Sequence, residues 1–167
     1  SVNQSKILFY EADYVERMER LIQKYQVPAG WITLEILEGL AMENIDKLNQ
    51  VIRRLKKIGF RVSMDDFGSG YSSLNILGNL RINELKLDKG FLKELEEDGR
   101  QRQKVIIKHI IVISKSLKIS TVAEGIETEE DQRMVRELGC DFGQGYYYCR
   151  PVPVEEFNEK YMKRREA

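Results

Sequence analysis

Short apolar runs alternate with amphipathic stretches along the whole chain. The apolar runs are typical of buried strands, and the stretches that follow repeat their apolar residues every three or four positions, which is the helical period. The clearest pair is a strand at 31–39, "WITLEILEG", followed by an amphipathic helix at 43–59 that ends at Gly59. Similar pairs continue to the end of the sequence.

Six strand–helix units are predicted on this basis. The expected strands are 1–5, 31–39, 60–66, 82–88, 119–125 and 140–148. The expected helices are about 12–25, 43–59, 72–80, 101–117, 128–139 and 153–167, with Thr128 as an N-cap and Pro153 near the start of the last helix. No linker divides the chain, so one domain is expected over 1–167. The regular alternation favours a parallel sheet covered by helices, as a barrel or as a doubly wound sheet.

Composition and charge narrow the classes of partner. Lysine and arginine together number 27, as do aspartate and glutamate, so the net charge gives no sign of a DNA, RNA or membrane partner. No apolar run approaches the length of a membrane span. Cys140 and Cys149 fit neither a disulfide framework nor a zinc motif. We therefore expect reduced thiols and a cytoplasmic location, either as a free protein or as the cytoplasmic part of a membrane-anchored one.

Polar residues stand at the carboxyl end of nearly every expected strand. They are Asn3, Glu35, Glu38, Asp65, Asp66, Lys86, Asp88, Glu124, Glu127 and Gln144. The carboxyl ends of parallel strands share one face, and that face carries the site in such folds. Residues far apart in the sequence are therefore expected to converge there.

Two interpretations of these acids compete. At one strand, a carboxylate that caps a helix or lies in a loop is the simpler explanation, but this explanation is poor for five or six strands together. Clustered carboxylates repel one another unless they are protonated or neutralised. Oxygen ligands that include an amide favour Mg²⁺ or Mn²⁺ over Zn²⁺. Adjacent side chains at a strand end point in different directions, so Asp65 and Asp66 could serve two metal ions, as in a two-metal phosphodiesterase.

Several motifs resemble those of EAL-domain proteins, the cyclic di-GMP phosphodiesterases. "DDFGSGYSSL" is similar to the family signature DDFG(T/S)GYSSL, and "SVNQS" resembles its VNxS strand. "LEILEG", "LKLD", "VAEGIE" and "GQGYYYCRPVP" resemble the ExxE, LKxD, AEGxE and QGYxxxxPxP motifs. The match runs in order over essentially the whole chain, which makes it specific.

The resemblance implies an α/β fold, a TIM-like barrel of the EAL type in which one strand is antiparallel. On that template the chain supplies six βα units, beginning at the Asn3 strand, and lacks the first two strands together with the Glu-Ala-Leu motif. We therefore expect an incomplete barrel that corresponds to about the C-terminal two-thirds of an EAL domain. The chain would then be a fragment of a longer protein or a truncated domain, and inactive by itself.

The resemblance also implies roles for individual residues. Asn3, Glu35 and Asp65 would hold one metal ion, and Asp66 and Glu124 the second, with Asp65 bridging. Lys86 would orient the attacking water or meet the phosphate, so Lys86 and Glu124 are the candidate catalytic residues. Glu127 and Gln144 would line the substrate site. Glu38 would brace the loop after the Asp pair.

The activity implied is hydrolysis of cyclic di-GMP to linear pGpG in bacterial signalling, with Mg²⁺ or Mn²⁺ in a two-metal site. The alternative is a catalytically inactive receptor or interaction module, because family members that lost ligands act in that way. Every ligand position within this segment is retained, which favours the enzyme. A homodimer is expected, with a sensory or cyclase domain elsewhere in the full protein.

Overall fold

Six parallel strands form one sheet in the order in which they occur along the chain. The structure is a computed structural model that describes residues 1–68, 74–92 and 97–162. The strands are β1 (Val2–Asn3), β2 (Thr33–Leu37), β3 (Arg61–Phe67), β4 (Glu84–Leu87), β5 (Ser120–Ala123) and β6 (Phe142–Gly143). A doubly wound sheet would reverse its strand order at a switch point, whereas this order winds in one direction, as in a barrel. The sheet is not closed, and β1 and β6 are its edges.

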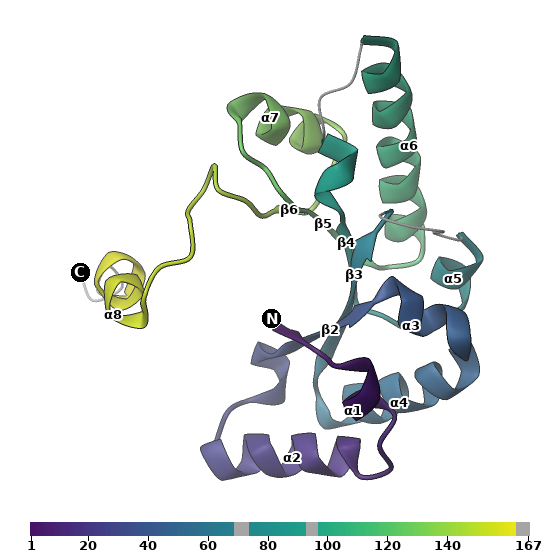
Figure 1. Ribbon diagram of the computed structural model, residues 1–167, viewed down its shortest axis with the longest axis vertical. Helices are drawn as coiled ribbons and strands as arrows, with labels where there is room; N and C mark the ends of the chain where they lie inside the picture. Colours follow the sequence, from purple (N-terminus) through teal and green to yellow (C-terminus); the bar gives the residue numbers. More distant parts are fainter. Residues whose placement is uncertain (69–73, 93–96, 163–167) are drawn as a thin grey trace.

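Helices follow every strand, and those that lie between two strands form the crossovers that parallel pairing requires. They are α1 (Lys6–Phe9), α2 (Tyr14–Tyr25), η1 (Ala29–Trp31), α3 (Glu38–Glu43), α4 (Ile45–Ile58), α5 (Leu74–Asn79), η2 (Lys89–Leu92), α6 (Glu97–Ser116), α7 (Glu129–Glu137), α8 (Val154–Phe157) and the π-helical η3 (Asn158–Met162). Figure 1 shows α8 standing apart from the sheet at the end of an extended segment. No helix in the described ranges is both long enough and apolar enough to cross a bilayer.

The core lies between the strands and the helices that cover them. Ile52 and Leu55 of α4 are fully buried, and Ile107 and Ile111 of α6 are 1% exposed. They belong to one large cluster that also contains the apolar residues of β2, β3 and β4. A second, smaller cluster consists of Ala123, Ile126 and Val135. The apolar residues of these helices thus pack against the strands, as the helical periodicity of the sequence predicted.

The strand predicted at 31–39 is too long at both ends. η1 precedes it, and the chain enters α3 at Glu38, where an acidic side chain in the first turn suits the helix dipole. The helix predicted at 43–59 begins later, because Asn44 adopts a φ of −156° and its side chain accepts a hydrogen bond from the Lys47 amide at 2.9 Å. Its end at Gly59 is confirmed.

The strand predicted at 140–148 is also too long at both ends. β6 contains only Phe142 and Gly143. The Gln144 amide still donates to the Ala123 carbonyl at 2.8 Å, but the Tyr148 amide then donates to the Gly145 carbonyl at 3.1 Å, which turns the chain. The three tyrosines 146–148 therefore lie in a turn and not on alternating faces of a strand.

Other boundaries shift by smaller amounts. The predicted helix at 12–25 is preceded by the separate short helix α1. The helix predicted at 72–80 begins in residues outside the described ranges and is seen as α5. The helix predicted at 153–167 is seen as α8 and η3, with Pro153 as its N-cap, and residues 163–167 lie outside the described ranges. Thr128 is the N-cap of α7, as predicted.

Candidate functional site

A buried lysine is surrounded by carboxylates at the carboxyl edge of the sheet. The Lys86 Nζ atom lies 2.8 Å from Glu35 Oε1, 2.8 Å from Asp65 Oδ1 and 2.8 Å from Glu124 Oε1. Lys86 is 5% exposed, Glu35 is 6% exposed and Asp65 is 8% exposed, so these ion pairs are largely shielded from water. Side chains from β2, β3 and β4 and from the residue after β5 thus meet in one polar centre.

The strand register explains how these residues meet. Leu37 of β2 is paired with Asp65 of β3, and Lys86 of β4 is paired with Val122 of β5. The Glu124 amide extends the last pairing by donating to the Leu87 carbonyl at 3.1 Å. Because the strands are parallel, their carboxyl ends reach the same edge, as the polar strand ends predicted.

A β-bulge brings the second aspartate into the same cluster. In a regular strand, adjacent side chains point to opposite faces. Here the pairing of β3 with β4 shifts register between Met64 and Phe67, and Asp66 has a φ of 56°. As a result, Asp65, Asp66 and Glu124 each offer a carboxylate oxygen within 4.8 Å of the other two. The two aspartates therefore face one site.

The close approach of the carboxylates and their burial change their pKa values. Burial, together with the nearby charges of Asp65 and Asp88, raises the pKa of Asp66. Burial also raises the pKa of Glu124, although the hydrogen bond from Lys86 opposes the change. For Lys86, burial lowers the pKa, but its contacts with the carboxylate oxygens of Asp65, Glu124 and Glu35 outweigh this effect and the pKa is raised overall. The ammonium balances one charge, and the remaining carboxylates keep a net negative charge that a divalent cation could neutralise.

The other predicted residues lie on β1 or in the segments that follow β2, β5 and β6. Asn3 is exposed and is paired with Glu35 in the register of β1 and β2. Glu38 begins α3 and is 6% exposed. Its predicted contact with the loop after the Asp pair involves residues 69–73, which lie outside the described ranges. Glu127 and Gln144 are exposed in the segments after β5 and β6.

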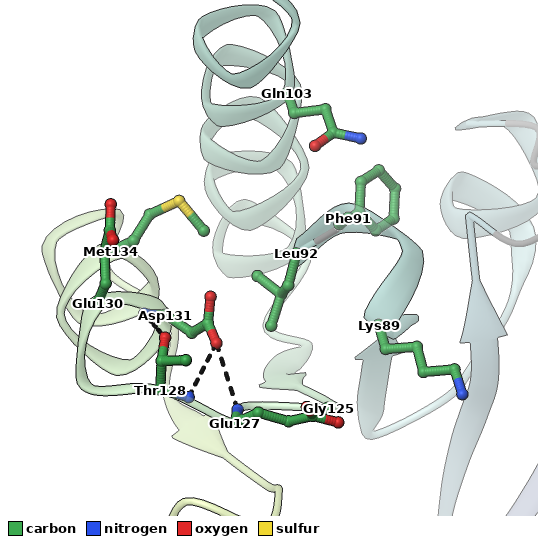
Figure 2. A pocket seen from close by; sticks show the side chains of 10 residues that line it. All are labelled: Lys89, Phe91, Leu92, Gln103, Gly125, Glu127, Thr128, Glu130, Asp131 and Met134. Carbon is green, nitrogen blue, oxygen red and sulfur yellow. Dashed lines mark hydrogen bonds between the residues drawn. The ribbon is translucent and has the colours of Figure 1, made fainter. Parts of the chain in front are cut away.

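A pocket of about 500 Å³ adjoins the segment that carries Glu127. Its lining comes from η2, α6, α7 and the loop after β5, and Figure 2 shows these elements around it. Asp131 of α7 accepts hydrogen bonds from the amides of Glu127 at 3.3 Å and Thr128 at 3.0 Å. Together with Thr128, it completes a capping box that fixes the start of α7 and the backbone of Glu127.

Two residues that shape the surroundings of the site were missing from the sequence interpretation. Asp131 was not singled out, although the spacing of Thr128 and Asp131 is the capping-box signature that would have identified it. Asp88 was noted only as a strand-end residue. Its Oδ1 atom accepts a hydrogen bond from the Gly90 amide at 2.7 Å, and its charge helps to raise the pKa of Asp66.

Comparisons with known proteins agree with this geometry. The family model of the EAL domain matches residues 1–151. The chain is 33% identical over 159 residues to the signaling protein YkoW of Bacillus subtilis, a match that covers 95% of the chain and 20% of YkoW. It is 35% identical over 156 residues to the bifunctional diguanylate cyclase/cyclic di-GMP phosphodiesterase MucR of Pseudomonas aeruginosa, which covers 93% of the chain and 22% of MucR.

A solved structure, the PaMucR phosphodiesterase in complex with c-di-GMP, matches with a TM-score of 0.85 at 35% identity. This match covers 93% of the chain and 62% of that structure's chain. The protein therefore belongs to the EAL-domain family, and its open six-stranded sheet is part of an EAL-type TIM-like fold. The chain spans about a fifth of the length of YkoW and MucR, at 20% and 22%.

Proposed function

We propose that this chain carries most of the active site of a metal-dependent phosphodiesterase that hydrolyses cyclic di-GMP to linear pGpG. The observation that supports this most strongly is the centre in which Lys86 contacts Glu35, Asp65 and Glu124 at 2.8 Å. The name of MucR as a cyclic di-GMP phosphodiesterase and the matching complex with c-di-GMP support the substrate.

The residues fit a pair of divalent cations. Asp65, Asp66 and Glu124 place oxygen atoms within 4.8 Å of one another, and carboxylate oxygens are the ligands that Mg²⁺ and Mn²⁺ prefer. In our proposal these three residues hold one ion, while Asn3, Glu35 and Asp65 hold the other. Bound there, the two ions would activate water and neutralise the charge that develops on the phosphate.

Lys86 contributes the cationic side chain. Its raised pKa keeps the ammonium charged at neutral pH, so it can stabilise a non-bridging phosphate oxygen or orient the attacking water. Glu124 shares contact with Lys86 and with the Asp pair, which suits a residue that helps to position that water. We assign Glu127 and Gln144 to the substrate site and Glu38 to bracing the loop after Asp66.

The receptor interpretation differs in one testable respect, because it predicts nucleotide binding without turnover. None of the ligand positions in this chain is substituted, which favours turnover. Because the chain spans about a fifth of YkoW and MucR, at 20% and 22%, we also propose that sensory or cyclase domains accompany it in the full-length protein.

Turnover should depend on the type of divalent cation. We expect EDTA to reduce pGpG formation by the full-length protein to background, and added Mg²⁺ or Mn²⁺ to restore it. Ca²⁺ should hold the substrate without comparable turnover, because it accepts longer bonds and a looser geometry. Chromatography of the nucleotides measures the result, and a rate that EDTA leaves unchanged would contradict the metal assignment.

The complete domain should form a homodimer. Family members commonly pair near the loop after the Asp pair and the helices that follow, and α6 exposes more than half of Val105, Ile106 and Val112. We expect Ile106→Glu to dissociate the dimer in light scattering, because it places a charge among these apolar residues. Ile7→Glu, on the exposed face of α1, is the matched control. A wild-type protein that is monomeric at tens of micromolar would contradict this prediction.

A further inference from the structure

The short helix η2 contacts both segments that carry the acidic cluster, which are the end of β3 and the loop after β5. It begins one residue after β4, and the end of β4 is hydrogen-bonded to the segments on both sides. The Asp88 amide donates to the Phe67 carbonyl at 3.1 Å, and the Leu87 carbonyl accepts from the Glu124 amide at 3.1 Å. The residues of η2 are therefore placed between the turn after Asp66 and the loop that begins at Glu124.

On one side, the Phe91 ring lies against the backbone of Gly68. A Cβ atom at Gly68 would lie 2.0 Å from Phe91 Cε2, so no other residue fits this contact without displacement of the ring. Gly68 also has a φ of 100°, which favours glycine. Phe91 packs against the main core, which includes Phe67. The ring thus supports the turn two residues after Asp66.

On the other side, η2 contacts the residue that follows Glu124. A Cβ atom at Gly125 would lie 2.4 Å from Lys89 Cβ, and Gly125 has a φ of 68°. Leu92 packs against the second cluster, which contains Ala123 and Ile126 on either side of Glu124. Figure 2 shows Leu92 directed toward the loop of Glu127 while the Phe91 ring points away from it.

The helix itself is held in place. Asp88 Oδ1 accepts the Gly90 amide at 2.7 Å, and Gln103 Nε2 of α6 donates to the Gly90 carbonyl at 3.5 Å. Anchored in this way, η2 contacts the turn at Gly68 through Phe91 and the residues around Glu124 through Leu92. The cluster is sensitive to that separation, because the oxygens of Asp65, Asp66 and Glu124 lie within 4.8 Å of one another.

We propose that Phe91 is a positioning residue that holds the turn after Asp66, so that Asp66 and Glu124 stay close enough to bind one divalent cation. This inference rests on the proposed function, and it assigns Phe91 no contact with the substrate or the reacting atoms. Its effect should reach the metal through the backbone of residues 66–68.

The test compares Phe91→Leu with Phe60→Leu in the full-length protein. Phe60 is 2% exposed and precedes β3 at the end opposite Asp65, so the control makes the same change in the core away from the site. We expect Phe91→Leu to raise the Kd for Mn²⁺, measured by electron paramagnetic resonance, by roughly tenfold or more, as loss of outer support does at other metal sites. It should also lower kcat and speed amide hydrogen exchange at residues 66–68 in metal-free protein.

Phe60→Leu should lower the melting temperature and leave the Kd for Mn²⁺ unchanged. If Phe91→Leu behaves in the same way, the inference is wrong and the proposed function stands. If the wild-type protein binds no Mn²⁺, the metal assignment fails, and the positioning role fails with it. Phe91→Met, which conserves more of the side-chain length, replaces Phe91→Leu if that variant does not fold, and the same outcomes apply to it.

Discussion

Asp65→Asn should abolish turnover of cyclic di-GMP while the protein remains folded. Asp65 contacts Lys86 at 2.8 Å and shares its cluster with Asp66 and Glu124, so the substitution removes the charge proposed to bridge two metal ions. Loss of several kcal/mol of metal-derived stabilisation corresponds to roughly a hundredfold lower kcat or more. An asparagine oxygen can still accept from Lys86, which favours retention of the fold.

Chromatography of pGpG measures the expected loss of turnover, and a thermal melt measures the expected retention of the fold. Asp13→Asn is the matched control, because it makes the same change at an exposed residue that pairs with Arg17 at 2.8 Å. The control should keep wild-type activity. Near-wild-type pGpG formation by Asp65→Asn would contradict the bridging role.

Completing the barrel with the two further strands of the family fold should have the second large effect, on both stability and activity. β1 and β6 are the edges of the sheet, and unpaired edges invite association with other chains. Apolar side chains near the β6 edge and in the C-terminal helix are exposed, at 57% for Phe142, 70% for Val154 and 47% for Phe157. Burying a large apolar side chain stabilises a protein by about 1.5–3 kcal/mol, against a total stability of about 5–15 kcal/mol.

We therefore expect the 167-residue chain alone to associate or to melt early, and to be inactive. A version extended upstream by the two strands of the family barrel, including the Glu-Ala-Leu motif, should melt cooperatively at a higher temperature and hydrolyse cyclic di-GMP. Calorimetry and a nucleotide assay on both versions provide the comparison. Equal activity, together with a cooperative monomeric melt of the short chain, would show that the open edges and the absent motif do not matter.

The convergence of the acids could be predicted because it depends on topology alone. Parallel strands place their carboxyl ends at one edge, so Glu35, Asp65 and Glu124 had to approach one another once the strand order was known. Their shared contact with Lys86 could not be predicted from the residues, since it depends on the register of four strands. The capping of α7 by Thr128 is local and could be predicted from residue type and spacing.

The local pattern could not show how the Asp pair reaches one cluster. Asp65 and Asp66 were expected to serve one two-metal site, and the register shift between Met64 and Phe67 and the positive φ of Asp66 bring both side chains there. That bulge depends on β4, which is far away in the sequence. The tyrosines 146–148 have strand propensity, yet the hydrogen bond from Tyr148 to Gly145 makes a turn.

The proposed activity can be tested by hydrolysis of cyclic di-GMP by the full-length protein in H₂¹⁸O with Mn²⁺, followed by mass spectrometry of the product. We expect pGpG that carries one ¹⁸O on its terminal phosphate, with no product when EDTA is present. Binding of cyclic di-GMP without formation of pGpG under these conditions would contradict the enzyme and favour the receptor.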